Sequence, residues 1–181
     1  RSYINHILIL LAACFMWNAG SLAQNNPFKI KDELYKYYQV IDANIQSDKV
    51  LGMTDTLFEM AKKDGDVKAQ CLALYSRQRH YHSIGDFKAE KEEFHRVAPF
   101  ILKTPYHQYY FGMWYNIILR NINDKNTLTA SNDIQAFRNE AMKLKNDYGV
   151  FQSYILQGSL FSISGHYRIA LTYYNMALEY S

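Results

Sequence analysis

The stretch "GSLFSISGHYRIALTYYNMALEYS" (residues 158–181) holds small and aromatic residues at helical spacings. Gly158 and Ala170 leave room for two helices to cross closely, because a larger side chain at either position would push the backbones apart. Gly165 marks the turn, since glycine tolerates the left-handed conformation that ends a helix. The sequence predicts a tightly packed antiparallel helix pair, whose packing residues are Tyr154, Gly158, Phe161, Gly165, Ala170, Tyr174 and Ala177.

The rest of the chain shows the same periodicity. Apolar residues recur every three or four positions, as in Leu34, Tyr38 and Ile41, and no strand-like alternation of useful length appears. Gly-Asp at 65–66 and 85–86 predicts a helix stop followed by an N-cap. Thr104-Pro105 predicts a cap and a first-turn proline. The segment 121–126 is expected to be the longest loop, and Gly149 to end a helix.

These signals predict eight or nine helices and an all-α fold. Helix pairs are expected to begin near Lys31, Val67, Tyr106 and Phe151, which lie 36, 39 and 45 residues apart. A spacing of this size is typical of helical repeats, in which stacked pairs bury a continuous core. The predicted architecture is therefore an α-solenoid of antiparallel helix pairs over residues 24–181.

The last pair resembles a tetratricopeptide repeat, whose pattern is W-x2-L-G-x2-Y, then A-x3-F, then Pro. Tyr154, Gly158, Phe161, Ala170 and Tyr174 follow this spacing. Gln157 departs from it, and the position of the proline falls beyond residue 181. A weaker copy surrounds Gly85, with Gln78 and Glu90 where the family has small residues. The whole chain resembles the exported sensor regions of bacterial histidine kinases and transcriptional regulators.

The first 23 residues have the layout of a secretory signal, with Arg1 before an apolar run and small residues at Ser21 and Ala23. Residues 11–14, which end at Cys14, also resemble a bacterial lipobox, so lipidation of Cys14 is an alternative to cleavage after Ala23. Either route predicts an exported protein, periplasmic or in the cell envelope. An apolar last helix predicts further chain beyond Ser181.

Composition excludes several classes of protein. The formal charge of +3 on 181 residues is too small to indicate a nucleic-acid partner. Cys71 alone would remain after cleavage, so no disulfide framework is expected, and its simplest role is a buried core residue. No phosphate-loop or hydrolase motif occurs. We therefore expect no catalytic residues, no cofactor and no enzyme activity in this segment.

The polar cluster "RQRHYH" (residues 77–82) is the strongest candidate for a metal site, but helix geometry argues against metal binding there. His80 and His82 point about 200° apart on a helix, so they cannot chelate one ion. The cluster is expected to be a solvated helix face. The aromatic run at 109–115 is expected to place Phe111, Trp114 and Tyr115 in the core and Tyr109 at the surface.

The family resemblance implies a ligand groove lined by the first helix of each pair. Some family grooves clamp a peptide carboxylate, a role that Arg79, Asn116 and Arg120 could fill because guanidinium binds carboxylate bidentately. Each of these residues could equally be an ordinary surface side chain. The residues that the spacing places toward the groove are Tyr75, Arg79, His82, Asn116, Arg120, Gln152, Ser159 and Ser162.

The function that the resemblance implies is binding of a protein or peptide, as the sensing or scaffolding part of a larger regulator. Homodimerisation of the full-length protein is compatible with it. Membrane attachment is expected only through a span downstream of the segment or through a lipid on Cys14. The alternative is an outer-surface, glycan-binding nutrient lipoprotein on a similar scaffold, which lipidation and glycan binding would distinguish.

Overall fold

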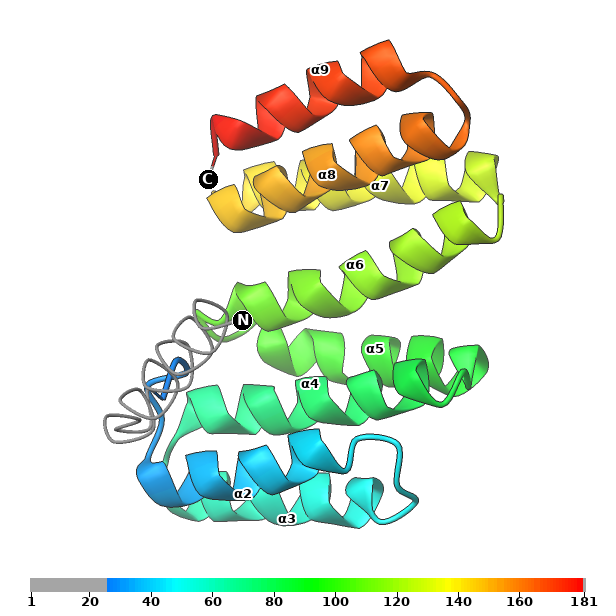
Figure 1. The fold of residues 1–181 in the computed structure, drawn as a ribbon. Coiled ribbons are helices and arrows are strands. Elements are labelled where there is room, and N and C mark those ends of the chain that lie inside the picture. Colours follow the sequence, from blue (N-terminus) through cyan, green and yellow to red (C-terminus); the bar gives the residue numbers. More distant parts are fainter. Residues whose placement is uncertain (1–25, 181) are drawn as a thin grey trace, which may run out of the picture.

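The computed structural model describes residues 26–180, and within them it contains eight α-helices and no strand. Figure 1 shows the helices stacked from α2 and α3 at one end to α9 at the other. The all-α prediction is confirmed, and the predicted signal sequence lies outside the described residues. The helices are α2 (Asp32–Ala43), α3 (Val50–Lys63), α4 (Val67–Ser83), α5 (Phe87–Ile101), α6 (His107–Asn123), α7 (Thr127–Lys143), α8 (Asp147–Ile163) and α9 (Tyr167–Leu178).

A step of 40 residues relates successive helix pairs. Helices α4 to α9 begin at residues 67, 87, 107, 127, 147 and 167, so each helix starts 20 residues after the one before it. Helix α3 follows the same frame, because its buried positions 50, 54, 57 and 61 recur as buried positions 90, 94, 97 and 101 of α5 and 130, 134, 137 and 141 of α7. The step is longer than the 34 residues of the tetratricopeptide repeat.

Five of the seven turns between the described helices share one geometry. Gly65, Gly85, Lys125, Lys145 and Gly165 all have positive φ, between 50° and 78°. The amide of the following residue bonds back to a carbonyl five positions earlier, as in Asp66 N to Ala61 O (2.8 Å). This bond satisfies a carbonyl at the end of the helix. The Gly-Asp predictions are confirmed, because Asp66 Oδ1 accepts from Ala69 N at 2.9 Å and Asp86 Oδ1 accepts from Ala89 N at 3.0 Å.

The boundaries around α6 and α8 differ from the predictions. Pro105 precedes α6, which begins at His107, so it is not a first-turn proline. The first half of the segment 121–126 is helical, since α6 continues to Asn123. Gly149 lies inside α8, where an added Cβ would be 2.8 Å from Ala141 Cβ, so this glycine permits a close helix crossing. The pair predicted to begin at Phe151 therefore begins at Asp147.

The even-numbered helices form the inner contact layer. Helix α4 packs on α2, α6 on α4 and α8 on α6, whereas the backbones of α3, α5, α7 and α9 do not approach one another as closely. The side chains of α3 and α5 still meet, since the rings of Phe58 and Phe100 lie 6.0 Å apart. Cys71 is buried, as predicted, and so is Phe111. Tyr109, which was expected at the surface, is only 5% exposed, because α6 is covered by α4, α5, α7 and α8. The backbones of the odd-numbered helices are thus farther apart than those of the even-numbered helices.

Candidate functional site

Three tyrosines from three even-numbered helices come together on one face. Burial raises the pKa of Tyr75 on α4, Tyr115 on α6 and Tyr148 on α8, and the pKa of Tyr148 is raised further by Tyr75 and Tyr115. The Tyr75 ring covers Gly112 so closely that a Cβ there would lie 3.2 Å from Tyr75 Cε2. A larger residue at 112 would displace this ring from its place beside α6.

Gln152 extends this group along α8. Its Nε2 donates to Tyr148 OH at 2.8 Å, while its buried Oε1 has no hydrogen-bond partner. A buried acceptor without a donor is costly unless something supplies one. We call Tyr75, Tyr115, Tyr148 and Gln152 the tyrosine face. Sequence reasoning identified Tyr75 and Gln152, but it placed Tyr115 in the core and did not select Tyr148.

Arg79 lies next to the tyrosine face and is already paired. Its Nη1 donates to Asp42 Oδ1 at 2.7 Å and to Tyr38 OH at 3.2 Å, both on α2. Its guanidinium carbon also lies 5.9 Å from the centre of the Tyr75 ring. Arg79 therefore ties α4 to α2 and holds the edge of the Tyr75 ring.

His82 and Arg120 meet at a buried carboxylate instead of facing a groove. Glu90 on α5 is fully buried, and its Oε1 accepts from Gln78 Nε2 at 2.9 Å and lies 3.0 Å from His82 Nδ1. Arg120 Nη1 donates to Glu90 Oε2, and its guanidinium stacks on the Phe87 ring at 4.0 Å. We call Gln78, His82, Glu90 and Arg120 the Glu90 network.

Two predictions about these residues are corrected by their contacts. The arginines of the expected carboxylate clamp each have an internal partner, Asp42 for Arg79 and Glu90 for Arg120, so they do not form one open clamp with Asn116. The segment 77–82 is not a solvated face throughout. Gln78 is buried, and so is His80, whose Nδ1 lies 2.7 Å from Ile45 O.

Three further predicted groove residues, Asn116, Ser159 and Ser162, lie on α6 and α8. Ser159 Oγ donates to Ile155 O at 2.9 Å and lies 3.4 Å from Tyr174 OH. Asn116 and Ser162 are half-buried on α6 and α8. Of the eight predicted groove residues, only Tyr75 and Gln152 belong to the tyrosine face.

The residues expected to pack the last pair lie between α8 and α9. A Cβ on Gly158 would be 2.4 Å from Tyr174 Cε1, so the ring occupies the space that glycine leaves. Ala170 and Ala177 are buried. Phe161 stacks on Tyr173 with ring centres 5.5 Å apart, and Tyr154 lies 6.4 Å from Tyr173. Gly165 has a φ of +78° at the turn.

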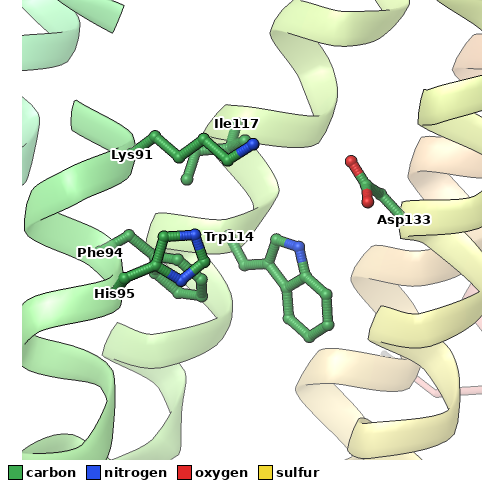
Figure 2. A pocket seen from close by; sticks show the side chains of 6 residues that line it. All are labelled: Lys91, Phe94, His95, Trp114, Ile117 and Asp133. Atoms are coloured by element: carbon green, nitrogen blue, oxygen red, sulfur yellow. The ribbon is translucent and has the colours of Figure 1, made fainter. Parts of the chain in front are cut away.

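A cleft of about 240 Å³ opens between α5 and α7, above α6. Figure 2 shows Trp114 projecting from α6 into this space, with Lys91 and His95 on the α5 side and Asp133 on the α7 side. Burial raises the pKa of Asp133, which Asn121 and Lys91 partly offset. The cleft therefore combines an aromatic ring with a half-buried carboxylate.

Comparison with models of protein families, with curated proteins and with solved structures finds no significant match to this chain. Between residues 26 and 180, no three His, Cys, Asp or Glu side chains lie close enough to hold a metal ion. In the same part of the chain, no helix is long and apolar enough to span a membrane. The tyrosine face and the cleft are therefore the features from which a function can be inferred.

Proposed function

We propose that this chain is an exported, tetratricopeptide-like α-solenoid that binds a protein or peptide and forms the sensing or scaffolding part of a larger bacterial regulator. The observation that carries the binding proposal is the tyrosine face. It combines three half-exposed or exposed tyrosines, one from each of three helices, with the unpartnered Oε1 of Gln152. Tyrosine is enriched at interfaces because its ring is apolar and its hydroxyl can bond to a partner.

The helix contacts support the solenoid part of this proposal. In a curved stack of helix pairs, the helices on the inner side approach one another while those on the outer side are spread apart. Helices α2, α4, α6 and α8 form such a continuous layer, whereas the backbones of α3, α5, α7 and α9 lie farther apart. The tyrosine face belongs to the inner layer, where a peptide would contact several pairs at once.

Export and membership of a larger regulator follow from the sequence resemblance. The signal-like segment at residues 1–23 supports export to the periplasm or cell envelope. Helix α9 presents exposed apolar side chains, including Tyr167, Leu171 and Leu178. An apolar surface of this kind is compatible with a further protein surface packing against it.

Selection of peptides from a random displayed library against the full chain would test the binding proposal. Selected peptides are then titrated calorimetrically. Tyr148→Ala and Gln152→Ala are expected to weaken binding at least tenfold, because both change the tyrosine face at its exposed side. Tyr167→Ala, which removes an exposed ring from α9, is the matched control and should leave the affinity unchanged.

The proposal fails if no peptide binds to the folded protein, or if the Tyr148 and Gln152 variants bind as tightly as the parent. Half-exposed tyrosine rings also suit stacking on sugars, so a panel of soluble oligosaccharides is titrated in parallel. Binding of an oligosaccharide that depends on Tyr148, together with a lipid on Cys14 by mass spectrometry, would replace this proposal with the glycan-binding lipoprotein.

A further inference from the structure

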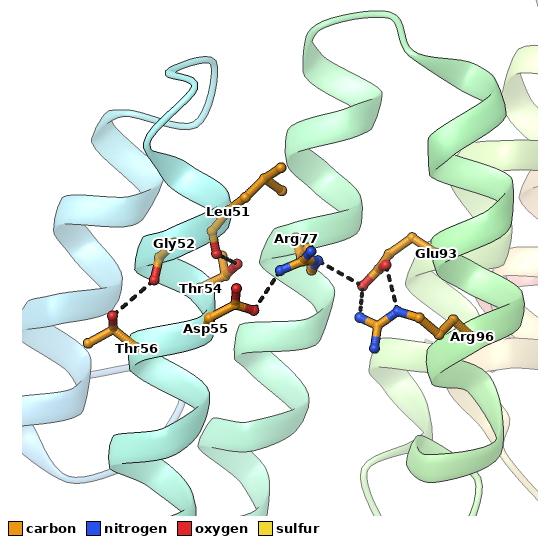
Figure 3. A network of polar contacts seen from close by, with 8 residues as sticks. All are labelled: Leu51, Gly52, Thr54, Asp55, Thr56, Arg77, Glu93 and Arg96. Atoms are coloured by element: carbon orange, nitrogen blue, oxygen red, sulfur yellow. Dashed lines mark hydrogen bonds and ion pairs between the residues drawn. The ribbon is translucent and has the colours of Figure 1, made fainter.

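Helices α3 and α5 are bridged by an arginine. Arg77 on α4 places Nη1 2.6 Å from Asp55 Oδ1 on α3 and Nε 3.4 Å from Glu93 Oε1 on α5 (Figure 3). Glu93 is almost fully buried and also accepts from Arg96 Nε at 2.9 Å. The guanidinium of Arg77 on α4 thus joins α3 to α5.

The cleft between α5 and α7 lies one 40-residue step further along the chain and has no arginine at the position of Arg77. Forty residues beyond Arg77 and Glu93 stand Ile117 and Asp133, which line the cleft between α5 and α7. Asp133 Oδ2 accepts from Asn121 Nδ2 at 3.2 Å, and among residues 26–180 no ion pair involves its carboxylate. Among the described residues, the carboxylate at the position equivalent to Glu93 therefore has no guanidinium partner.

Trp114 gives the cleft a second feature that suits a cation. Its ring is half-buried and projects between the two walls (Figure 2). A guanidinium stacks well on an indole face and binds a carboxylate through two parallel hydrogen bonds, whereas an ammonium is a more strongly hydrated point charge. The volume of about 240 Å³ is suited to one side chain and small for a drug-sized ligand.

We propose that the cleft between α5 and α7 receives an arginine side chain of a partner protein. Its guanidinium binds Asp133 and stacks on Trp114, at the position equivalent to that of Arg77 between α3 and α5. The inference depends on the proposed function only in that the partner is a protein. The site lies between odd-numbered helices and is separate from the tyrosine face, so the two can succeed or fail independently.

Among the described residues, Lys91 and the titratable His95 are the basic side chains that line this cleft. The Lys91 side chain is exposed on α5, and no ion pair within residues 26–180 joins it to Asp133. An incoming guanidinium would be repelled by Lys91 and attracted by Asp133. Removing the lysine charge should therefore strengthen binding of a cation, whereas it would weaken binding of an anion.

The test uses the full chain carrying Trp17→Phe, so that Trp114 is the single tryptophan. The probe is N-acetyl-arginine amide, followed by Trp114 fluorescence and by the indole N–H signal in NMR spectra. A ligand of this size is expected to bind with a Kd on the order of 1 mM. N-acetyl-citrulline amide is the uncharged isostere, and it should bind at least tenfold more weakly.

Variants then assign the contact. Asp133→Asn should weaken arginine binding at least tenfold. Ile117→Arg should abolish it, because the new side chain supplies an internal guanidinium at the position equivalent to Arg77. Lys91→Met should strengthen binding several-fold. Glu92→Gln, which removes an exposed carboxylate from the same helix as Lys91, and Tyr148→Ala, which changes the tyrosine face, should both leave it unchanged.

Three results would each overturn the proposal. These are equal binding of the citrulline and arginine probes, no saturable change in the Trp114 signals, and weaker binding after Lys91→Met. Circular dichroism confirms folding of every variant, and Asp133→Asn keeps the site testable if Ile117→Arg does not fold. If the arginine probe does not bind but peptides still bind to the tyrosine face, the arginine site is rejected and the proposed function is not.

Discussion

Replacing Glu90 by alanine should destabilise the protein by about 3–5 kcal/mol, the typical cost of removing one partner from a buried ion pair. The substitution leaves the Arg120 side chain, which is only 12% exposed, without its carboxylate. It also removes the hydrogen-bond partner of His82 and one of the two acceptors of Gln78 Nε2, the other being Met113 O at 3.3 Å. A domain of this size is stable by about 5–15 kcal/mol, so the loss would be a large part of the total.

The next helix pair shows how the same positions are filled without charge. Forty residues beyond Gln78, His82, Glu90 and Arg120 stand Ile118, Ile122, Ala130 and Leu160, all of which are buried. Replacing a buried ionic cluster by packed apolar residues is often neutral or stabilising. The fourfold variant Gln78→Ile, His82→Ile, Glu90→Ala, Arg120→Leu should therefore recover most of the stability that Glu90→Ala loses.

Urea unfolding followed by circular dichroism at equilibrium measures both variants against the parent. A shift of the midpoint at constant slope reports a change of stability and not of the extent of unfolding. Glu92→Ala, an exposed acid two positions along α5, is the control and should change stability by less than about 0.5 kcal/mol. A fourfold variant no more stable than Glu90→Ala would refute the 40-residue correspondence between the pairs.

Three further predictions follow from single contacts. Gly158→Ala should lower the free energy of unfolding by about 1–3 kcal/mol, because its Cβ would lie 2.4 Å from Tyr174 Cε1. Gly52→Ala, whose Cβ would have no atom within 4 Å, should stabilise α3 by about 0.5–1 kcal/mol. Melting temperatures that move in the same direction for both variants would contradict the packing. Burial raises the pKa of Asp133, so the folded state disfavours its charged form; Asp133→Asn should raise stability at neutral pH, by an amount that shrinks as the pH falls through that pKa. Burial also raises the pKa of Tyr38 to about 12 against 10.0 when unperturbed, so stability should fall as the pH rises from 10 to 12, and Tyr38→Phe should reduce that fall in unfolding experiments across the range.

Local chemistry made the helices and several turns predictable. Glycine followed by aspartate at 65–66 and 85–86 combines a left-handed residue with an N-cap, and both functions are set by neighbouring atoms. The turn at Lys145 was missed because a lysine adopts the positive φ that the sequence suggests for glycine. Gly149, taken for the breaker, instead sits where α8 crosses Ala141. A glycine that permits a turn and one that permits a close crossing look alike in the sequence.

The candidate sites depend on contacts between distant segments, and the sequence predicted them poorly. Arg120 and Glu90 are 30 residues apart in the sequence. Their ion pair depends on how α5 and α6 are placed along each other, which the local sequence does not determine. Tyr109 was misplaced for a related reason. A helix covered on several sides buries more than one stripe, so the position of a side chain relative to a single stripe does not determine its exposure.

The Glu90 network also bears on how the helix pairs keep their order. The repeated frame gives α5 and α7 the same buried positions, so apolar packing alone distinguishes their sites weakly. A carboxylate at 90 can be satisfied only between α4, which supplies Gln78 and His82, and α6, which supplies Arg120. Placed against Ile118 and Ile122, the same carboxylate would be buried without a donor, at a cost of several kcal/mol. We infer that this network adds little net stability but makes exchange of neighbouring pairs unfavourable, as buried polar groups do for the register of coiled coils.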